Sequence, residues 1–199
     1  MSIYKKKLTQ KTSKEESLLV EKCCRGNAKA QKCLYDRFSP KMMGVCLRYA
    51  QNKADAEDIL QEGFIRVFTS LNQFQFKGSL EGWIRRIMVN TSINFLKKNK
   101  KIKEQLNVED VFPKAIDKTD MNLRTQDIMS MLNQLPEGYK TVINLYAIEG
   151  YAHKEIGEML NISEGTSRSQ YSRGKKMLRE IQAAYDKIKM QDSEGGKND

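Results

Sequence analysis

The chain of 199 residues has no hydrophobic run long enough to cross a bilayer, for which about 20 consecutive apolar residues are needed. Its beginning, MSIYKKKLTQKTSK, carries lysines but lacks the apolar core that follows them in a signal peptide. These two absences argue against a membrane-spanning or exported protein and predict a cytoplasmic one.

Cysteine and histidine are scarce, with four cysteines (Cys23, Cys24, Cys33 and Cys46) and one histidine, His153. The cysteines lack the paired CxxC spacing of structural zinc sites, and adjacent Cys23 and Cys24 would point about 100° apart on a helix. Reduced thiols in a helical core are expected, with no metal. His153 has no nucleophile, carboxylate or second histidine near it in the sequence, which predicts a place at the surface or at a helix start.

Signatures of an enzyme are missing as well. No GxxxxGK motif for a nucleotide is present. The only dense acidic run, Asp55–Glu62, has no histidine beside it, whereas a metal-dependent nuclease or hydrolase needs ligands clustered around a pocket. An enzyme is therefore the least favoured of three functional hypotheses, and no catalytic residue, cofactor or small-molecule substrate is expected.

Positive charge, in contrast, is abundant. Lys and Arg number 35 against 25 Asp and Glu, which gives a formal net charge of +10. Such a charge predicts attraction to a polyanion, and both nucleic acid and an acidic membrane surface satisfy that description.

Apolar residues recur at helical spacing, so the expected fold class is all-α. Ser13 and Glu16 form a capping box that starts a helix ending near Gly26. Asn27 can cap a second helix, and Pro40 is expected to open a third.

A fourth helix, expected over Asp55–Leu71, has two unlike sides. Its buried side is the apolar stripe of Ala56, Leu60, Phe64, Val67 and Leu71. Its other side carries the polar residues Asp55, Asp58, Gln61, Glu62 and Arg66. An acidic face on a basic protein indicates a protein partner with a positive surface, although simple solubility explains the spacing equally well.

The loop NQFQFKGS follows this helix and precedes another, expected from Leu80 to about Lys98. Exposed aromatic side chains beside cations can stack on an unpaired base. On the pattern alone, burial of Phe74 and Phe76 in the core is the stronger interpretation. Ser79 is expected to cap the helix.

The segment YAHKEIGEMLNISEGTSRSQYSRGKKMLR is the most informative. A helix from about His153 to Leu160, a turn, and a second helix capped by Ser163 form the layout of a helix-turn-helix DNA-reading unit. In the second helix the inner positions are Ser167, Tyr171, Gly174 and Leu178. The outer positions are small or cationic, namely Gly165, Arg168, Ser169, Ser172, Arg173 and Lys176. Such a face suits the major groove, where Arg and Ser can reach bases or phosphates. A solvated helix with ordinary charges is the plainer alternative.

Three segments together, DAEDILQEGFIRVFTSLNQF, FKGSLEGWIRRIMVNTSINFLKK and LPEGYKTVINLYAIEGYAHKEIGEMLNISEGTSRSQYSRGKKMLR, resemble an extracytoplasmic-function sigma factor of the sigma-70 family. The likeness covers roughly residues 15–182 in the family's order. It implies two small helical domains joined by a flexible linker. The boundaries expected are a disordered basic tail at 1–14, a region 2 domain at 15–98, a linker at 99–124, a region 4 domain at 125–185 and a disordered tail at 186–199.

The resemblance implies a site in the first domain for the −10 element as single-stranded DNA. In family members a base is flipped into a pocket between the loop and the following helix. The residues implied on this chain are Phe74, Phe76, Lys77, Ser79, Trp83, Arg85, Arg86 and Asn90. Base stacking contributes about 1–3 kcal/mol, comparable to the cost of unstacking a base, so opening needs no ATP.

The resemblance also implies a site in the second domain for the −35 element as duplex. Its residues here are Arg168, Ser169, Ser172, Arg173, Lys175 and Lys176. Two positions depart from the family pattern. Ser167 stands where relatives usually carry an apolar residue, which predicts looser packing, and Gln170 stands where Arg is common, which predicts a changed −35 preference.

The partners implied are core RNA polymerase, through its beta-prime clamp and beta flap, promoter DNA and an anti-sigma factor that can hold the protein at the inner membrane. The polymerase-binding residues implied are Asp55, Asp58, Gln61, Glu62 and Arg66. The alternative function is a helix-turn-helix regulator that binds duplex DNA without polymerase.

Overall fold

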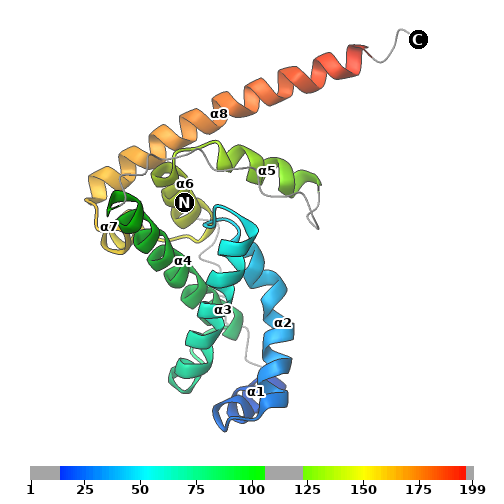
Figure 1. Cartoon of the computed structure of the whole chain (residues 1–199), viewed down its shortest axis with the longest axis vertical. Helices are drawn as coiled ribbons and strands as arrows, with labels where there is room; N and C mark the ends of the chain where they lie inside the picture. The colour runs from blue at the N-terminus through cyan, green and yellow to red at the C-terminus, as the bar shows by residue number, and fades with distance from the viewer. Residues whose placement is uncertain (1–13, 106–122, 196–199) are drawn as a thin grey trace. The chain divides into compact units, whose positions relative to one another are not determined.

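The computed structural model describes residues 14–105 and 123–195, and the regular elements in these ranges are all helical, as expected (Figure 1). Contacts divide the described helices into two units, α1–α4 with η1 and α5–α8 with η2. No helix within these ranges is long and apolar enough to cross a membrane. The proposed cap Ser13, the N-terminal tail to residue 13 and residues 106–122 of the linker lie outside the described residues.

The first unit begins with α1 (Lys14–Cys24), which ends before Gly26 as predicted. Gly26 has φ +75°, a left-handed conformation that favours glycine at the end of a helix. Asn27 then caps α2 (Ala28–Cys46), because its Oδ1 accepts a hydrogen bond from the Ala30 N–H at 3.0 Å. Both predicted helix boundaries are confirmed.

The prediction that Pro40 opens a third helix is wrong, since α2 runs through it. A proline inside a helix loses one backbone hydrogen bond and crowds the preceding turn. Here the apolar residues on both sides form one stripe, so packing outweighs the local cost. The stripe consists of Leu34, Phe38, Met42 and Val45, all at most 3% exposed.

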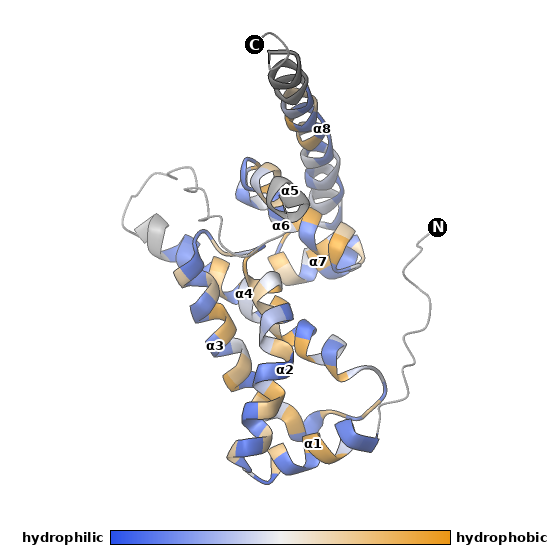
Figure 2. Cartoon of the chain, turned by 90° about the vertical axis from the view of Figure 1, so that its right-hand side faces the viewer, coloured by the Kyte–Doolittle hydropathy of each residue, from blue (hydrophilic) through white to orange (hydrophobic). Residues whose placement is uncertain are grey.

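The core of the first unit lies where α2, α3 (Lys53–Ser70) and α4 (Leu80–Gln105) pack against one another. Figure 2 shows hydrophobic positions recurring between hydrophilic ones along these helices. The large side chains that this packing buries completely include Leu34, Met42, Ile59, Leu80, Ile84 and Met88. An ion pair of 2.7 Å between Lys41 and Glu81 joins α2 to the start of α4.

Gly63 marks a close approach of α3 to α4. A Cβ atom at this position would lie 2.3 Å from Met88 Sδ, and Met88 is completely buried. The thioether therefore occupies the space that a side chain at residue 63 would need.

Gly63→Ala is expected to destabilise the first unit by about 1–3 kcal/mol, because overpacking displaces Met88 within a filled core. Trp83, the single tryptophan, reports on this unit in denaturant unfolding followed by fluorescence. Gly44→Ala is the matched control, since a Cβ on Gly44 meets nothing within 4 Å and alanine favours a helix. Equal midpoints for the two variants would contradict the account. Adding Met88→Ala should cost less than the sum of the single changes.

The second unit contains α5 (Leu123–Asn133), α6 (Glu137–Ile143), the π-helical turn η2 (Asn144–Ile148), α7 (His153–Leu160) and α8 (Glu164–Gly195). The first part of α8 packs against α5, α6 and α7. Gly174 allows the contact with α6, because a Cβ there would lie 2.9 Å from Ile143 Cδ1.

Two helices are longer than predicted. α4 ends at Gln105 rather than near Lys98, and α8 continues to Gly195, so residues 186–195 are helical where a disordered tail was expected. Both extensions lack proline and, before Gly195, glycine, and they are rich in Lys and Gln. These residue types favour a helix. The extensions were not predicted because they carry no long apolar stripe.

α6 buries a lysine, since Lys140 is only 7% exposed. Its Nζ donates a hydrogen bond to Asn133 Oδ1 of α5 at 2.7 Å. Burial lowers the pKa of Lys140 from 10.5 to about 8, and the negative charge of Glu137 opposes this shift.

The second unit is expected to become more stable as the pH rises from about 8 to 10.5. In this window the unfolded chain still binds the proton that folded Lys140 has released, so raising the pH favours the folded state. The shift corresponds to at most roughly 3 kcal/mol in the free energy of unfolding. Lys140→Met should flatten this pH dependence in denaturant unfolding followed by circular dichroism. The same slope in the variant and the natural chain would contradict the assignment.

Candidate nucleic-acid and partner interfaces

The turn between α7 and α8 has the predicted geometry. Asn161 ends α7 with φ +56°, a left-handed conformation that Asn tolerates better than most residues. Ser163 caps α8, since its Oγ accepts a hydrogen bond from the Thr166 N–H at 2.9 Å. At the start of α7 the Glu155 carboxylate accepts a hydrogen bond from the Ala152 N–H at 2.7 Å. Local hydrogen bonds thus fix the starts of α7 and α8, and the predicted helix-turn-helix is confirmed.

The outer side of α8 presents most of the predicted duplex-binding residues to solvent. Arg168, Ser169, Ser172, Arg173 and Lys176 are exposed and share this side by helical spacing. Lys175 is also exposed but lies nearer the inner side, with its Nζ 5.7 Å from the centre of the Tyr171 ring. The major groove of DNA is wide enough to admit an α-helix, and the cations on this side of α8 could bind its bases or phosphates.

Two members of this side already have partners within the helix. Arg168 forms an ion pair with Glu164 at 2.5 Å, and Ser169 Oγ donates a hydrogen bond to the Thr166 carbonyl at 3.0 Å. The exposed Arg168–Glu164 pair contributes little to stability, so Arg168 can exchange its partner for a phosphate or a base at small cost.

His153 begins α7, which confirms the expected helix start, but its side chain does not lie at the surface. The side chain is buried, its ring stacks on Tyr146 with centroids 4.2 Å apart, and its Nδ1 lies 2.9 Å from Ser167 Oγ. Ser167 is completely buried, so the position expected to loosen packing is instead filled by a hydrogen-bonded pair. Residues fourteen positions apart meet here, and the periodicity of one helix cannot reveal that contact.

Gln170 does not join the outer side of α8. It is half-buried, and its side chain lies within 3.6–3.8 Å of the space that a Cβ on Gly138 would occupy. The side chain therefore packs toward the start of α6, and the changed duplex preference expected from the missing Arg stays a prediction.

The aromatic loop divides its two phenylalanines between core and surface. After the 3₁₀ turn η1 (Leu71–Gln73), Phe74 is 7% exposed and Phe76 is 44% exposed. The Phe74 ring centre lies 4.8 Å from that of Phe76 and 5.5 Å from that of Trp83. Phe74 is therefore core, as the pattern alone predicted, whereas Phe76 is not.

Phe76 has an unusual backbone, with φ +55°. For a bulky residue this left-handed conformation is strained, and such strain is found at functional sites. Strain and exposure together make Phe76 the most distinctive residue of the loop.

A hollow of about 480 Å³ opens beside this loop. Its walls come from α1 on one side and from η1 and the loop on the other. They are Ser17, Val20, Glu21, Cys24, Leu71, Asn72, Phe74 and Phe76. Trp83 and Asn90, which were expected to form a pocket with this loop, do not line it. The α1 wall was not predicted, because α1 lies about fifty residues earlier in the chain and no local pattern links the two segments.

The start of α4 brings together part of the remaining predicted single-strand site. Ser79, Trp83, Arg86 and Asn90 share one side by helical spacing. Ser79 Oγ accepts a hydrogen bond from the Gly82 N–H at 3.1 Å, which confirms its role as helix cap. Lys77 is exposed in the loop before them.

Arg85 does not belong to this group. It lies about 100° around α4 from Arg86 and is half-buried. The two neighbouring arginines therefore leave α4 in different directions.

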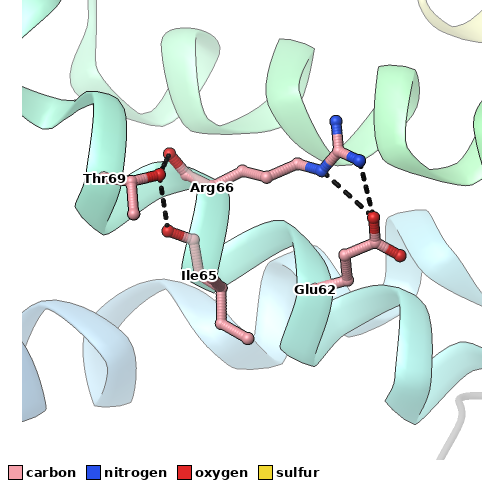
Figure 3. A network of polar contacts seen from close by, with 4 residues as sticks. All are labelled: Glu62, Ile65, Arg66 and Thr69. Atoms are coloured by element: carbon pink, nitrogen blue, oxygen red, sulfur yellow. Dashed lines mark hydrogen bonds and ion pairs between the residues drawn. The ribbon is translucent and has the colours of Figure 1, made fainter.

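The polar side of α3 is the third candidate surface. Asp58, Gln61, Glu62 and Arg66 are exposed on it, as predicted. Figure 3 shows Arg66 folded along the helix toward Glu62, with Nε and Nη2 at 3.2 and 2.6 Å from the same carboxylate oxygen. Asp55 stands apart because it is half-buried and is held by its cap, with its N–H donating to Asn52 Oδ1 at 2.8 Å.

Ile65 is the residue of this side that the sequence interpretation missed. It is 58% exposed, and helical spacing places it between Asp58, Gln61 and Glu62. The sequence could have indicated its exposure, because Ile65 lies outside the buried apolar stripe of the same helix. Interfaces commonly have an apolar centre within a polar rim, so Ile65 with its charged neighbours has the composition of a small interface patch.

Two family models match the chain, Sigma-70 region 2 over residues 34–102 and Sigma-70 region 4 over residues 125–178. The ECF RNA polymerase sigma factor SigE of Mycolicibacterium smegmatis is 32% identical over 160 residues, which cover 76% of this chain and 61% of that relative. The ECF RNA polymerase sigma-E factor of Haemophilus influenzae is 27% identical over 179 residues, which cover 82% of this chain and 93% of that relative.

A solved structure, the sigma factor RpoE in complex with the anti-sigma factor NepR from Bartonella quintana, resembles the chain in fold. The match covers 76% of this chain and 96% of that one, with a TM-score of 0.54 and 18% identity. Region 2 and region 4 occur in one chain in the order that the sequence motifs indicated, and the relatives that match most of the chain are sigma factors. The chain therefore belongs to the sigma-70 family of RNA polymerase sigma factors, in its extracytoplasmic-function group.

Proposed function

We propose that the chain binds core RNA polymerase, directs it to promoters and helps to open the −10 region. The observation that carries this proposal is that one chain has both sigma regions. It also has three surfaces suited to duplex DNA, single-stranded DNA and polymerase. These surfaces are the outer side of α8, the exposed Phe76 above a hollow, and the polar side of α3. A duplex-binding regulator explains only the first of them.

The second unit is proposed to read the −35 element as duplex. Arg168, Ser169, Ser172 and Arg173 would face base edges or phosphates in the major groove, and Lys175 and Lys176 would bind phosphates. Their exposure on α8 supports this assignment. The part of α8 that follows Leu178 lies beyond the matched region 4 and has no role in this proposal.

The first unit is proposed to hold the −10 element as a single strand. Phe76 would stack on an unpaired base, and contact with the buried ring of Phe74 would hold the ring of Phe76 in place. Lys77, Arg86 and Asn90 would bind the adjacent backbone or base edges, while Ser79 and Trp83 fix the loop. Arg85 would contact the strand only from the other flank of α4.

The polar side of α3 is proposed to bind the beta-prime clamp of the polymerase, with Asp58, Gln61, Glu62 and Arg66 around Ile65 and with Asp55 at the edge. The beta flap would bind the second unit. The negative charge would steer a positive partner, and Ile65 would supply apolar contact. The polymerase performs the chemistry, so the chain itself contributes no catalytic group.

Regulation by an anti-sigma factor is part of the proposal, because the Bartonella relative of this fold was solved with one. Such a partner would cover the surfaces that polymerase and DNA need, and would hold a cytoplasmic sigma factor inactive.

Binding of the purified chain to core RNA polymerase, measured by fluorescence anisotropy of the labelled chain, separates the two functions. A sigma factor should bind the core without DNA, and should then confer binding to promoter fragments on it. A duplex-binding regulator should not bind core polymerase and should bind a palindromic duplex as a dimer. If the chain binds duplex DNA tightly but does not bind core polymerase, the proposal is overturned.

A further inference from the structure

His153 and Ser167 form a buried contact between the two helices of the DNA-reading unit. His153 is the first residue of α7, and Ser167 lies in the first turn of α8. Their side chains meet at 2.9 Å, with His153 9% exposed and Ser167 completely buried. The contact spans the turn that sets the angle between the helices.

Aromatic rings hold the histidine in place. Tyr146 stacks on it with an interplanar angle of 11°, and Tyr171 of α8 lies 5.8 Å from it between ring centres. Tyr146 and Tyr171 are themselves 4.6 Å apart. The imidazole is thus fixed in a plane and directs Nδ1 to a single partner on α8.

Within the part of the chain that the structure describes, Nδ1 of His153 and Oγ of Ser167 are each other's hydrogen-bond partners. The hydroxyl can donate to Nδ1 or accept from it, so either neutral tautomer keeps the bond. Burial lowers the pKa of His153, Arg168 lowers it further and Glu164 opposes both, so the neutral ring is favoured. Removing one partner would leave the other buried and unpaired, which is the costly arrangement, whereas replacing both by apolar groups can be nearly neutral.

The position of Ser167 connects this pair to the outer side of α8. Arg168 and Ser169 follow it directly, and Ser172 and Arg173 lie one turn further along. A tilt or rotation of α8 at Ser167 moves all of these groups relative to α7. Placement errors of about 1 Å are enough to lose hydrogen bonds with base edges.

We infer that His153 and Ser167 are positioning residues that act as a matched pair and set the orientation of α8 for −35 recognition. They touch no DNA themselves. This inference rests on the proposed function, because it assigns the pair a role in the duplex reading of that same site.

The test uses four holoenzymes made with the natural chain, Ser167→Ala, which removes the hydroxyl without adding volume, His153→Phe and the double variant. Each is measured on a promoter mapped with the natural chain, as a fragment with its own −35 element and as one with that element scrambled. Circular dichroism confirms that each variant is folded at the assay temperature, and anisotropy measures its affinity for core polymerase.

Each single variant should lose about tenfold in discrimination between the two fragments, because one unpaired buried group displaces α8. Core affinity should not change. The double variant should recover most of the discrimination. A purely structural role predicts lowered melting temperatures with unchanged discrimination in the folded variants, and this would overturn the inference. Losses that multiply in the double variant would also overturn the matched pair.

The proposed function and this inference fail in different ways. If the natural chain gives no promoter-dependent binding with core polymerase, the proposed function fails. If the natural chain discriminates and all folded variants discriminate equally well, only the inference fails.

Discussion

Phe76→Ala is expected to reduce promoter opening by roughly 5–150-fold, since the stacking of one base on an aromatic ring contributes about 1–3 kcal/mol. The ring of Phe76 is the exposed half of the Phe74–Phe76 pair, and the backbone holds it there at φ +55°. Opening is measured by the reactivity of unpaired thymines in the −10 region toward permanganate. Core affinity and duplex −35 binding should stay unchanged.

Two further variants separate the ring from the backbone strain. Phe76→Trp keeps an aromatic face and should retain opening. Phe76→Gly removes the ring but relieves the left-handed conformation, so it should raise the stability of the first unit while opening is still lost. Full opening by Phe76→Ala, or loss of opening by Phe76→Trp alone, would remove Phe76 from the single-strand site.

Ile65→Lys should weaken the affinity for core polymerase by at least roughly 30-fold. Loss of a central apolar contact typically costs about 2 kcal/mol or more at an interface hot spot, and the new cation would face a positive partner. Ile65 is more than half exposed, so the substitution should leave the folding stability nearly unchanged. Association is measured by titrating labelled chain with core enzyme.

Leu18→Lys is the matched control for Ile65→Lys, because Leu18 is 50% exposed on α1 and away from the polar side of α3. It should bind the core as the natural chain does. Asp58→Asn, in comparison, should slow association at low ionic strength, and the difference should fade as salt is added. Equal affinity for Ile65→Lys and Leu18→Lys would show that the polymerase binds another surface.

The helix-turn-helix could be predicted from sequence because its signals are local. The end of α7 at Leu160, the turn after it and the Ser163 cap lie within a few residues of one another, and the structure has all of them. The prediction that Pro40 begins a helix failed for the opposite reason. The apolar stripe from Leu34 to Val45 packs on other helices, and this packing outweighs the local effect of the proline.

The parts of the candidate sites that sequence missed depend on distant contacts. The α1 wall of the hollow and the His153–Ser167 contact join segments that no periodicity relates. The family resemblance placed both Arg85 and Arg86 in the single-strand site, but adjacent residues of a helix point about 100° apart. Ile65 could have been noticed, because helical spacing places this apolar residue outside the buried stripe and among the charged residues of α3.

Transcription in vitro with core polymerase, this chain and fragmented genomic DNA of the source organism shows whether the chain selects promoters. The 5′ ends of the transcripts are sequenced, and a second sigma factor shows that the core is active. A sigma factor should yield transcripts that require the chain and share two upstream motifs about two helical turns apart. An active core that yields no chain-dependent transcript would contradict the proposed function.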